Sequence, residues 1–312
     1  MHLFAGLFTF PMSLLLVGGA VTACSSDPSP ASDSSASSAS SKTAVVAAFY
    51  PLAFAAERIG GQRAIVRDLT PKGAEPHDLE PTADQVNAIE DDALVVVMGR
   101  GFQPSVEKAA DKRKKPTVRV LDAVVREVGN VAAEGGGAVG IDPHVWLDPV
   151  RMKQVVNAIL GGMIEADPDG RAAYTANATA LDLDLDQLDR DFAAGLKTCT
   201  RKEIVTSHEA FGHLAARYGL TQEGITGLSP DAEPDPKRLA ELIDLVKQKG
   251  VTTIFTEDLV SPELAKTLSR ETGATTVVLS PLEVLTDATP GADYLSVMRD
   301  NLEKLRTALD CQ

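Results

Sequence analysis

The sequence predicts an α/β fold of parallel sheets flanked by helices, with one long helix between two halves of the chain. Short apolar runs that fit strands alternate with amphipathic runs that fit helices in both halves. Strands and helices that take turns along a chain form parallel sheets with helices on both faces. About 270 of the 312 residues follow an N-terminal leader and tether, which is enough for two lobes or for one large one.

The expected strands are short and apolar. They cover residues 44–49, 64–68, 94–98 and 118–121 in the first half, and 203–207, 252–256 and 275–279 in the second. Helices with apolar residues at three- and four-residue spacing fit between them, over 52–59, 82–91, 149–165, 236–249 and 262–272. A last helix is expected to carry Leu295, Met298, Leu302, Leu305 and Leu309 at the same spacing. Thr82 and Gln85 form a capping box at the start of one helix, and Pro149 suits the first position of another.

The long helix is predicted over residues 170–196. Its Leu-Asp repeat at 181–186 alternates as a strand would, but a longer pattern with helical spacing outweighs it. The residues of that pattern are Leu181, Leu185, Leu188, Phe192 and Leu196. Four acidic residues are expected mostly on the solvent side, namely Asp182, Asp186, Asp189 and Asp191. The helix is long enough, at roughly 40 Å, to run across both lobes.

Residues 1–23 are expected to form a signal peptide. They contain no Asp, Glu, Lys or Arg, and small residues precede Cys24 as a processing site requires. Cleavage would leave Cys24 as a lipid-bearing N-terminal residue outside the cytoplasm. Residues 24–42 are almost entirely Ser, Ala, Asp and Pro, which predicts a flexible tether. The alternative for the leader is a buried N-terminal helix, since the positive charge that usually starts a signal peptide is missing.

The formal charge of −14 comes from 44 acidic and 30 basic residues, and its sign disfavours a nucleic-acid partner.

Beyond Cys24 the chain has two cysteines, Cys199 and Cys311. An even pair in an exported protein indicates a disulfide, and two free thiols are the alternative.

Histidines occur in loops beyond the predicted strands. His208 directly follows the strand at 203–207, and His77 lies in the loop after the strand that ends near residue 68. His144 lies in a turn made rigid by two Asp-Pro pairs, just before the helix that begins at Pro149. Ligands of α/β sheets collect beyond the carboxyl ends of strands, so the three imidazoles can converge, and we expect a metal site.

Two residues close to His208 are not expected to share its role. Side chains five residues apart on a helix point about 140° from each other, so His213 is expected to be a surface or packing residue. No HExxH motif is present that would make Glu209 the general base of a zinc hydrolase, and an enzyme is therefore not predicted.

Three motifs resemble those of a known family. They are PHDLEP at 76–81, DPHVWLDP at 142–149 and SHEAFGHLAARYGL at 207–220. These motifs resemble those of the zinc and manganese substrate-binding lipoproteins of bacterial ABC importers, a family that includes adhesin-like lipoproteins, and the resemblance runs from Ala44 to the C-terminus. It implies two α/β lobes, 43–168 and 198–312, joined by a backbone helix at 169–197, with the metal in the cleft between the lobes.

The resemblance also implies the metal ligands. The family's three histidine ligands fall on His77, His144 and His208. Its carboxylate ligand falls on Asp287, with Glu257, which follows the strand at 252–256, as the weaker alternative.

This ligand set favours zinc, because the manganese members of the family carry glutamate where this chain has His208. We expect a lipid-anchored monomer that captures zinc outside the cytoplasm and delivers it to an ABC permease. The alternatives are a surface adhesin or metal-storage lipoprotein on the same fold, and a manganese-specific binder.

Overall fold

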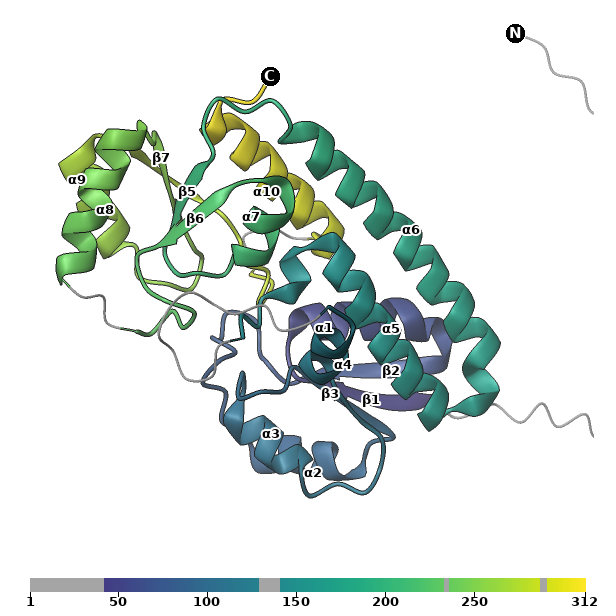
Figure 1. The fold of residues 1–312 in the computed structure, drawn as a ribbon. Coiled ribbons are helices and arrows are strands. Elements are labelled where there is room, and N and C mark those ends of the chain that lie inside the picture. Colours follow the sequence, from purple (N-terminus) through teal and green to yellow (C-terminus); the bar gives the residue numbers. More distant parts are fainter. Residues whose placement is uncertain (1–41, 129–140, 233–235, 287–290) are drawn as a thin grey trace, which may run out of the picture. The chain divides into compact units, whose positions relative to one another are not determined.

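The computed structural model describes residues 42–128, 141–232, 236–286 and 291–312. The predicted signal peptide, the predicted lipidation site Cys24 and the predicted ligand Asp287 lie outside the described residues. Within them, the chain forms two four-stranded parallel sheets with helices packed around each (Figure 1). No helix of this part of the chain is both long and apolar enough to cross a membrane.

The first sheet has the strand order β2-β1-β3-β4, and each neighbouring pair is parallel. Its strands are β1 (Thr43–Ala47), β2 (Ala64–Asp68), β3 (Leu94–Val97) and β4 (Thr117–Arg119). The helices of this half are α1 (Tyr50–Gly60), α2 (Ala83–Asp91), α3 (Pro104–Ala110), α4 (Val120–Val128) and α5 (Pro149–Ala166). The central strands β1 and β3 are buried almost throughout, as strands covered on both faces are.

The second sheet repeats this order as β6-β5-β7-β8. Its strands are β5 (Glu203–Thr206), β6 (Thr221–Gly224), β7 (Thr253–Thr256) and β8 (Thr275–Val278). The helices of this half are α7 (Gly212–Tyr218), α8 (Pro236–Lys249), α9 (Glu263–Thr272) and α10 (Tyr294–Leu309). In both sheets the chain adds its second strand on one side of the first, and its third and fourth on the other. The direction in which strands are added thus reverses after the second strand. Such a reversal leaves a crevice beyond the carboxyl ends of the two central strands, where ligands of open α/β sheets bind.

The long helix α6 (Arg171–Gly195) follows the first half and packs against helices of both. Its buried face carries Tyr174, Ala178, Leu181, Leu185, Leu188 and Phe192. It contacts α1 and α5 of the first half and α10 of the second (Figure 1). The predicted helix is therefore confirmed, and the helical spacing of leucines was the correct signal.

The acidic residues of α6 are half-buried, so the prediction of a solvent-facing acidic side is wrong in part. Asp186 pairs with Lys153 of α5 at 2.7 Å, and Asp189 pairs with Arg217 of α7 at 2.8 Å. The physical reason is that helices from both halves pack beside the apolar face of α6. Carboxylates that flank this face can then reach basic side chains of those helices.

Most predicted elements are confirmed to within two residues. The capping box of α2 is present, with Thr82 Oγ1 accepting from the Gln85 amide and Gln85 Oε1 accepting from the Thr82 amide. Four elements were not predicted: β6, whose sequence is polar, the short helices α3 and α7, and α4. The predicted strand over 118–121 is wrong in its second half, because α4 begins directly at Val120. Short elements have weak sequence signals, since neighbouring strands and helices stabilise them.

A disulfide joins Cys199, after α6, to Cys311, after α10, as predicted. Backbone hydrogen bonds hold the two segments together on both sides of it. The Thr200 amide donates to the Asp310 carbonyl at 3.2 Å, and the Gln312 amide donates to the Thr198 carbonyl at 3.2 Å. The C-terminus is therefore attached to the beginning of the second half.

Removing this disulfide should destabilise the protein and leave its folded structure unchanged. The double variant Cys199→Ser, Cys311→Ser should lower the free energy of unfolding by about 4–5 kcal/mol, because the bond spans 112 residues and restricts the unfolded chain. Guanidinium unfolding of the two proteins measures the difference. The reduced parent protein should match the double variant, and a loss below about 1 kcal/mol would contradict the prediction.

Candidate metal centre

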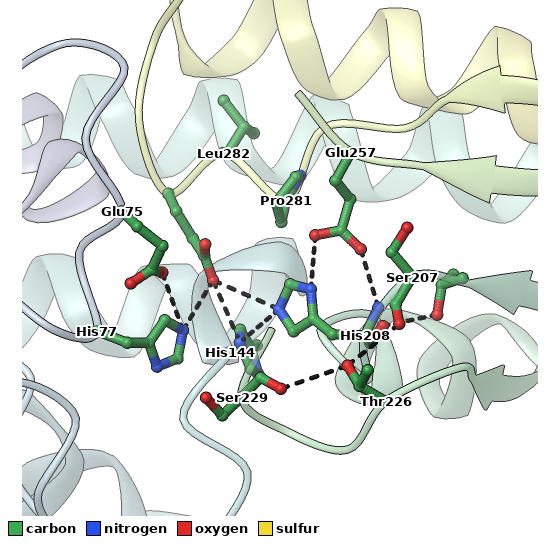
Figure 2. Close-up of polar contacts among 12 residues, drawn as sticks. Glu75, His77, His144, Ser207, His208, Thr226, Ser229, Glu257, Pro281 and Leu282 are labelled. Atoms are coloured by element: carbon green, nitrogen blue, oxygen red, sulfur yellow. Dashed lines mark hydrogen bonds and ion pairs between the residues drawn. The ribbon is translucent and has the colours of Figure 1, made fainter. Parts of the chain in front are cut away.

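Four side chains from separate segments meet where the two halves of the chain face each other. His77 comes from the loop between β2 and α2, His144 from the turn before α5, and His208 from the residues after β5. Glu283 comes from the segment after β8. One ligand atom from each of the four lies within 4.8 Å of the others, and Figure 2 shows the three imidazoles turned toward one another.

The distances in this cluster match a tetrahedral metal site. Glu283 Oε1 lies 3.1 Å from Nε2 of His77, 3.4 Å from Nε2 of His144 and 3.6 Å from Nε2 of His208. The Nε2 atoms of His144 and His208 are 3.4 Å apart. Ligands at about 2.0–2.1 Å from a tetrahedral zinc are separated by about 3.3–3.4 Å. Four of the six separations are therefore close to those of a tetrahedral site, and all six lie within 4.8 Å.

Asp142 orients His144. Its Oδ1 accepts from the backbone amide of His144 at 2.9 Å and from the ring Nδ1 at 2.8 Å. The imidazole is fully buried, and the next helix begins two residues after Leu147 with Asp148 as its cap. Because Nδ1 donates to a carboxylate, Nε2 is the nitrogen that faces the cluster.

Glu257 holds His208 in the same way. Its Oε1 accepts from the His208 amide at 3.0 Å, and its Oε2 lies 2.5 Å from Nδ1 (Figure 2). Glu257 directly follows β7 and His208 lies just after β5, so both lie at the crevice of the second sheet. The alternative assignment of Glu257 as a ligand does not fit this geometry, since the carboxylate lies against the far side of the ring from Nε2.

His77 is the most accessible of the three imidazoles. Its side chain is 12% exposed, whereas those of His144 and His208 are fully buried. Its ring lies 4.3 Å from that of Phe102, centroid to centroid, and a cavity of about 500 Å³ borders both residues. The His77 side is therefore the one through which an ion can reach the cluster.

Glu283 is the residue that sequence reasoning missed. It is 5% exposed and supplies the carboxylate of the cluster, whereas the predicted ligand Asp287 lies outside the described residues. Leu282, directly before it, has a φ of 57°, a left-handed conformation that costs on the order of 1–3 kcal/mol for a non-glycine residue. The sequence offered one hint, a carboxylate shortly after a strand end, but that hint applied equally to Glu257.

The buried charges of the cluster stabilise one another. Burial alone would raise the pKa of Glu283, but hydrogen bonds from His144, His208 and His77 hold it well below its usual range. Burial alone would lower the pKa of His208, but Glu257 and Glu283 raise it to about 10. The pKa of His144 is also raised, because Asp142 and Glu283 outweigh its burial. Without a metal, a proton on His208 thus balances part of the carboxylate charge.

His213 lies apart from the four ligand atoms, as predicted from its spacing. It is 5% exposed, which makes it a packing residue. Its Nε2 lies 3.0 Å from the carbonyl oxygen of Asp142, the residue whose side chain orients His144.

Three further carboxylates lie near His77. Glu75, Asp78 and Asp231 have oxygen atoms within 4.8 Å of one another, and Glu75 Oε1 is 3.9 Å from His77 Nε2. Burial and the charge of Glu283 raise the pKa of Glu75 to about 7. Negative charge gathered on this side attracts cations toward the cluster.

Comparison with known families identifies relatives over most of the chain. The family model described as "ZnuA: Zinc-uptake complex component A periplasmic" matches residues 45–308. The zinc-binding lipoprotein AdcA of Streptococcus pneumoniae is 38% identical over 281 residues, which cover 86% of this chain and 56% of AdcA. This chain therefore spans about half the length of that relative. The high-affinity zinc uptake system protein ZnuA of Bacillus subtilis is 33% identical over 317 residues, covering 98% of this chain and 97% of that protein.

Solved structures show the same fold. The Zn(II)-bound ZnuA-like domain of S. pneumoniae AdcA is 38% identical and superposes with a TM-score of 0.71, covering 86% of this chain and 99% of that one. A mutant of the laminin-binding adhesin Lmb of Streptococcus agalactiae is 33% identical with a TM-score of 0.77, at 86% and 99% coverage. The predicted fold class is thereby confirmed.

The raised histidine pKa values predict that metal binding releases protons. The pKa of His208 is raised to about 10, so a metal must displace a proton from this imidazole throughout the neutral range. Zinc affinity should rise by about one log unit per pH unit between pH 6 and 8, instead of levelling off near about 6.5, where free histidine titrates. Chelator competition at fixed ionic strength measures it. An affinity that does not change over this range would contradict the protonated cluster.

Proposed function

Because the chain belongs to the ZnuA family of zinc-uptake components, we propose that it captures zinc outside the cytoplasm and delivers it to an ABC permease for import. The observation that carries this proposal is the buried cluster of three Nε2 atoms and one carboxylate oxygen. We propose His77, His144, His208 and Glu283 as the ligands, because one ligand atom of each lies within 4.8 Å of the others. The remaining carboxylates, Asp142 and Glu257, would orient two of the imidazoles and leave their Nε2 atoms for the ion.

Zinc fits this donor set better than manganese. Imidazole nitrogen suits zinc, whereas carboxylate, carbonyl and water oxygen suit manganese. Four ligand atoms at tetrahedral spacing match the coordination that zinc adopts in sites made entirely of protein ligands. Several relatives in the comparison are described as zinc-binding, which agrees with this assignment.

A site with four protein ligands also favours transport over catalysis. Catalytic zinc sites keep one position open for water or substrate, while closed sites use four protein ligands. Here Glu283 fills the fourth position. We therefore assign the ion as cargo, and the opening of the cluster as the step that releases it.

The proposed location follows from the N-terminal sequence. A lipid on Cys24 and the Ser- and Ala-rich residues up to 42 would tether the folded part to the outer face of the cell membrane, within reach of a permease. The monomer is part of the same proposal, since one chain supplies all four ligands.

An adhesin is the second reading, and it rests on the likeness to Lmb alone. One of the Lmb structures is described as that of a bifunctional protein with adhesin and metal transporting activity. Adhesion needs an exposed binding surface, and it does not explain a cluster whose histidines are buried. Deleting the gene should therefore slow growth in zinc-depleted medium, and added zinc should restore growth.

Substitutions at the cluster test the ligand assignment. His144→Ala should lower zinc affinity by at least about 100-fold, because it removes a buried ligand and the imidazole partner of Asp142. Glu283→Gln should lower it by at least about tenfold, since the charge is lost while the shape is kept. Glu257→Gln should cost about 10–100-fold through the orientation of His208. Competition titration of the metal-free protein with zinc and with manganese measures all three.

Asp287→Asn is the matched control. It removes one carboxylate from the segment that follows Glu283, and zinc affinity should stay within twofold of the parent. A large loss in Asp287→Asn together with no loss in Glu283→Gln would restore Asp287 as the fourth ligand. Tighter binding of manganese than of zinc would overturn the choice of metal.

A further inference from the structure

We propose that Trp146 is a positioning residue for Glu283. Its indole N–H donates to the carbonyl of Pro281 at 2.7 Å, and this bond sets the turn from which Glu283 reaches the three imidazoles. The inference rests on the proposed metal site, because it concerns how the fourth ligand is held in place.

Trp146 is itself fixed from several sides. It is fully buried, and its ring lies 5.0 Å from that of Phe49 and 5.8 Å from that of Phe102, both approached edge to face. The Tyr294 hydroxyl donates to the Trp146 carbonyl at 2.5 Å. A buried indole whose ring and backbone are both held has little freedom, so its N–H direction is set by the fold.

The segment that leads to Glu283 is held at each residue. The Leu279 amide donates to the Thr256 carbonyl at 2.9 Å. Asn301 of α10 then contacts Ser280 twice, accepting from its amide at 3.0 Å and donating to its carbonyl at 2.7 Å. The Leu282 amide donates to Ser280 Oγ at 3.2 Å.

Among the residues of this segment, Pro281 is the one that Trp146 holds. A proline has no amide hydrogen, so its carbonyl is the one backbone group through which it can be held by a hydrogen bond. The donor to that carbonyl is the indole N–H. The next residue is Leu282, whose left-handed backbone persists only where its surroundings hold it. Figure 2 shows Pro281 and Leu282 beside the histidine cluster.

Trp146 also lies two residues after His144, and the centroids of their rings are 5.1 Å apart. One short turn therefore supplies a ligand from the first half and holds the loop that carries a ligand of the second half. The hydrogen bond from Trp146 to Pro281 links residues 135 positions apart and thereby places His144 and Glu283 next to each other.

A double-mutant cycle between Trp146→Phe and Glu283→Gln tests the proposal. Phenylalanine keeps an aromatic ring and removes the N–H. In the parent background, Trp146→Phe should weaken zinc binding by about tenfold, the range seen when a group that orients a ligand is lost. In the Glu283→Gln background it should weaken binding by less than about twofold, because the ligand it positions is already gone. Equal losses in both backgrounds would overturn the proposal and leave Trp146 as a packing residue.

Tyr174→Phe is the control for a general loss of stability. It removes a buried hydroxyl that bonds Asp167 at 2.8 Å, far along α6 from the cluster. It should lower the melting temperature without changing zinc affinity. The cycle also tests the two assignments separately. An unchanged zinc affinity in Glu283→Gln alone refutes the ligand assignment of Glu283. Losses of affinity that add in the double variant refute the positioning role of Trp146.

A measurement on the unsubstituted indole covers the case in which Trp146→Phe does not fold. The chain has one tryptophan, so a protein labelled with ¹⁵N-tryptophan has a single indole N–H signal. Because coupling between two sites is reciprocal, zinc binding through Glu283 should strengthen the bond to Pro281 and slow exchange of this hydrogen at least about tenfold. The slowing should be absent in Glu283→Gln. Equal slowing in both proteins, or none in the parent, would overturn the proposal.

Discussion

The contact between the Glu283 carboxylate and three imidazoles is the interaction on which the rest of the structure depends. All four groups are largely withdrawn from water, and a buried charge is tolerated only when opposite charge and hydrogen bonds compensate it. In the metal-free protein, neighbouring carboxylates raise the pKa of His208 to about 10, so a proton on this imidazole provides part of that compensation. A divalent cation provides it more fully, so the same arrangement that costs solvation in the free protein favours metal binding.

The two sheets have the same strand order, and this shared order places the side chains of the cluster. Both sheets place their first strand next to their third and thus open a crevice at the carboxyl ends of the central strands. His208 and Glu257 occupy the crevice of the second sheet, one following β5 and the other β7. Helix α6 packs against helices of both halves, and the disulfide ties the end of α10 to the start of the second half. These restraints limit how far the ligands can move apart.

Carboxylates act in two distinct ways around the cluster. Asp142 and Glu257 each accept a hydrogen from a backbone amide and from a ring Nδ1, and so fix the direction in which Nε2 points. Glu283 instead faces Nε2 atoms directly. In the proposed site, whether a carboxylate binds the ion or orients a ring therefore depends on which side of the imidazole it lies on. Residue type and strand-end position are the same for both roles.

The sequence by itself determined the α/β class, the long helix and the three histidines. Helical spacing and apolar runs reflect local burial, and the motifs around His77 and His144 are contiguous in the chain. Only the tertiary structure decided which carboxylate joins them. Glu283 depends on the left-handed turn at Leu282, and that turn is held by Trp146, 135 residues before Pro281, and by Asn301. Contacts over such distances leave no periodic pattern in the sequence, so the sequence alone did not indicate that Glu283 lies against the imidazoles.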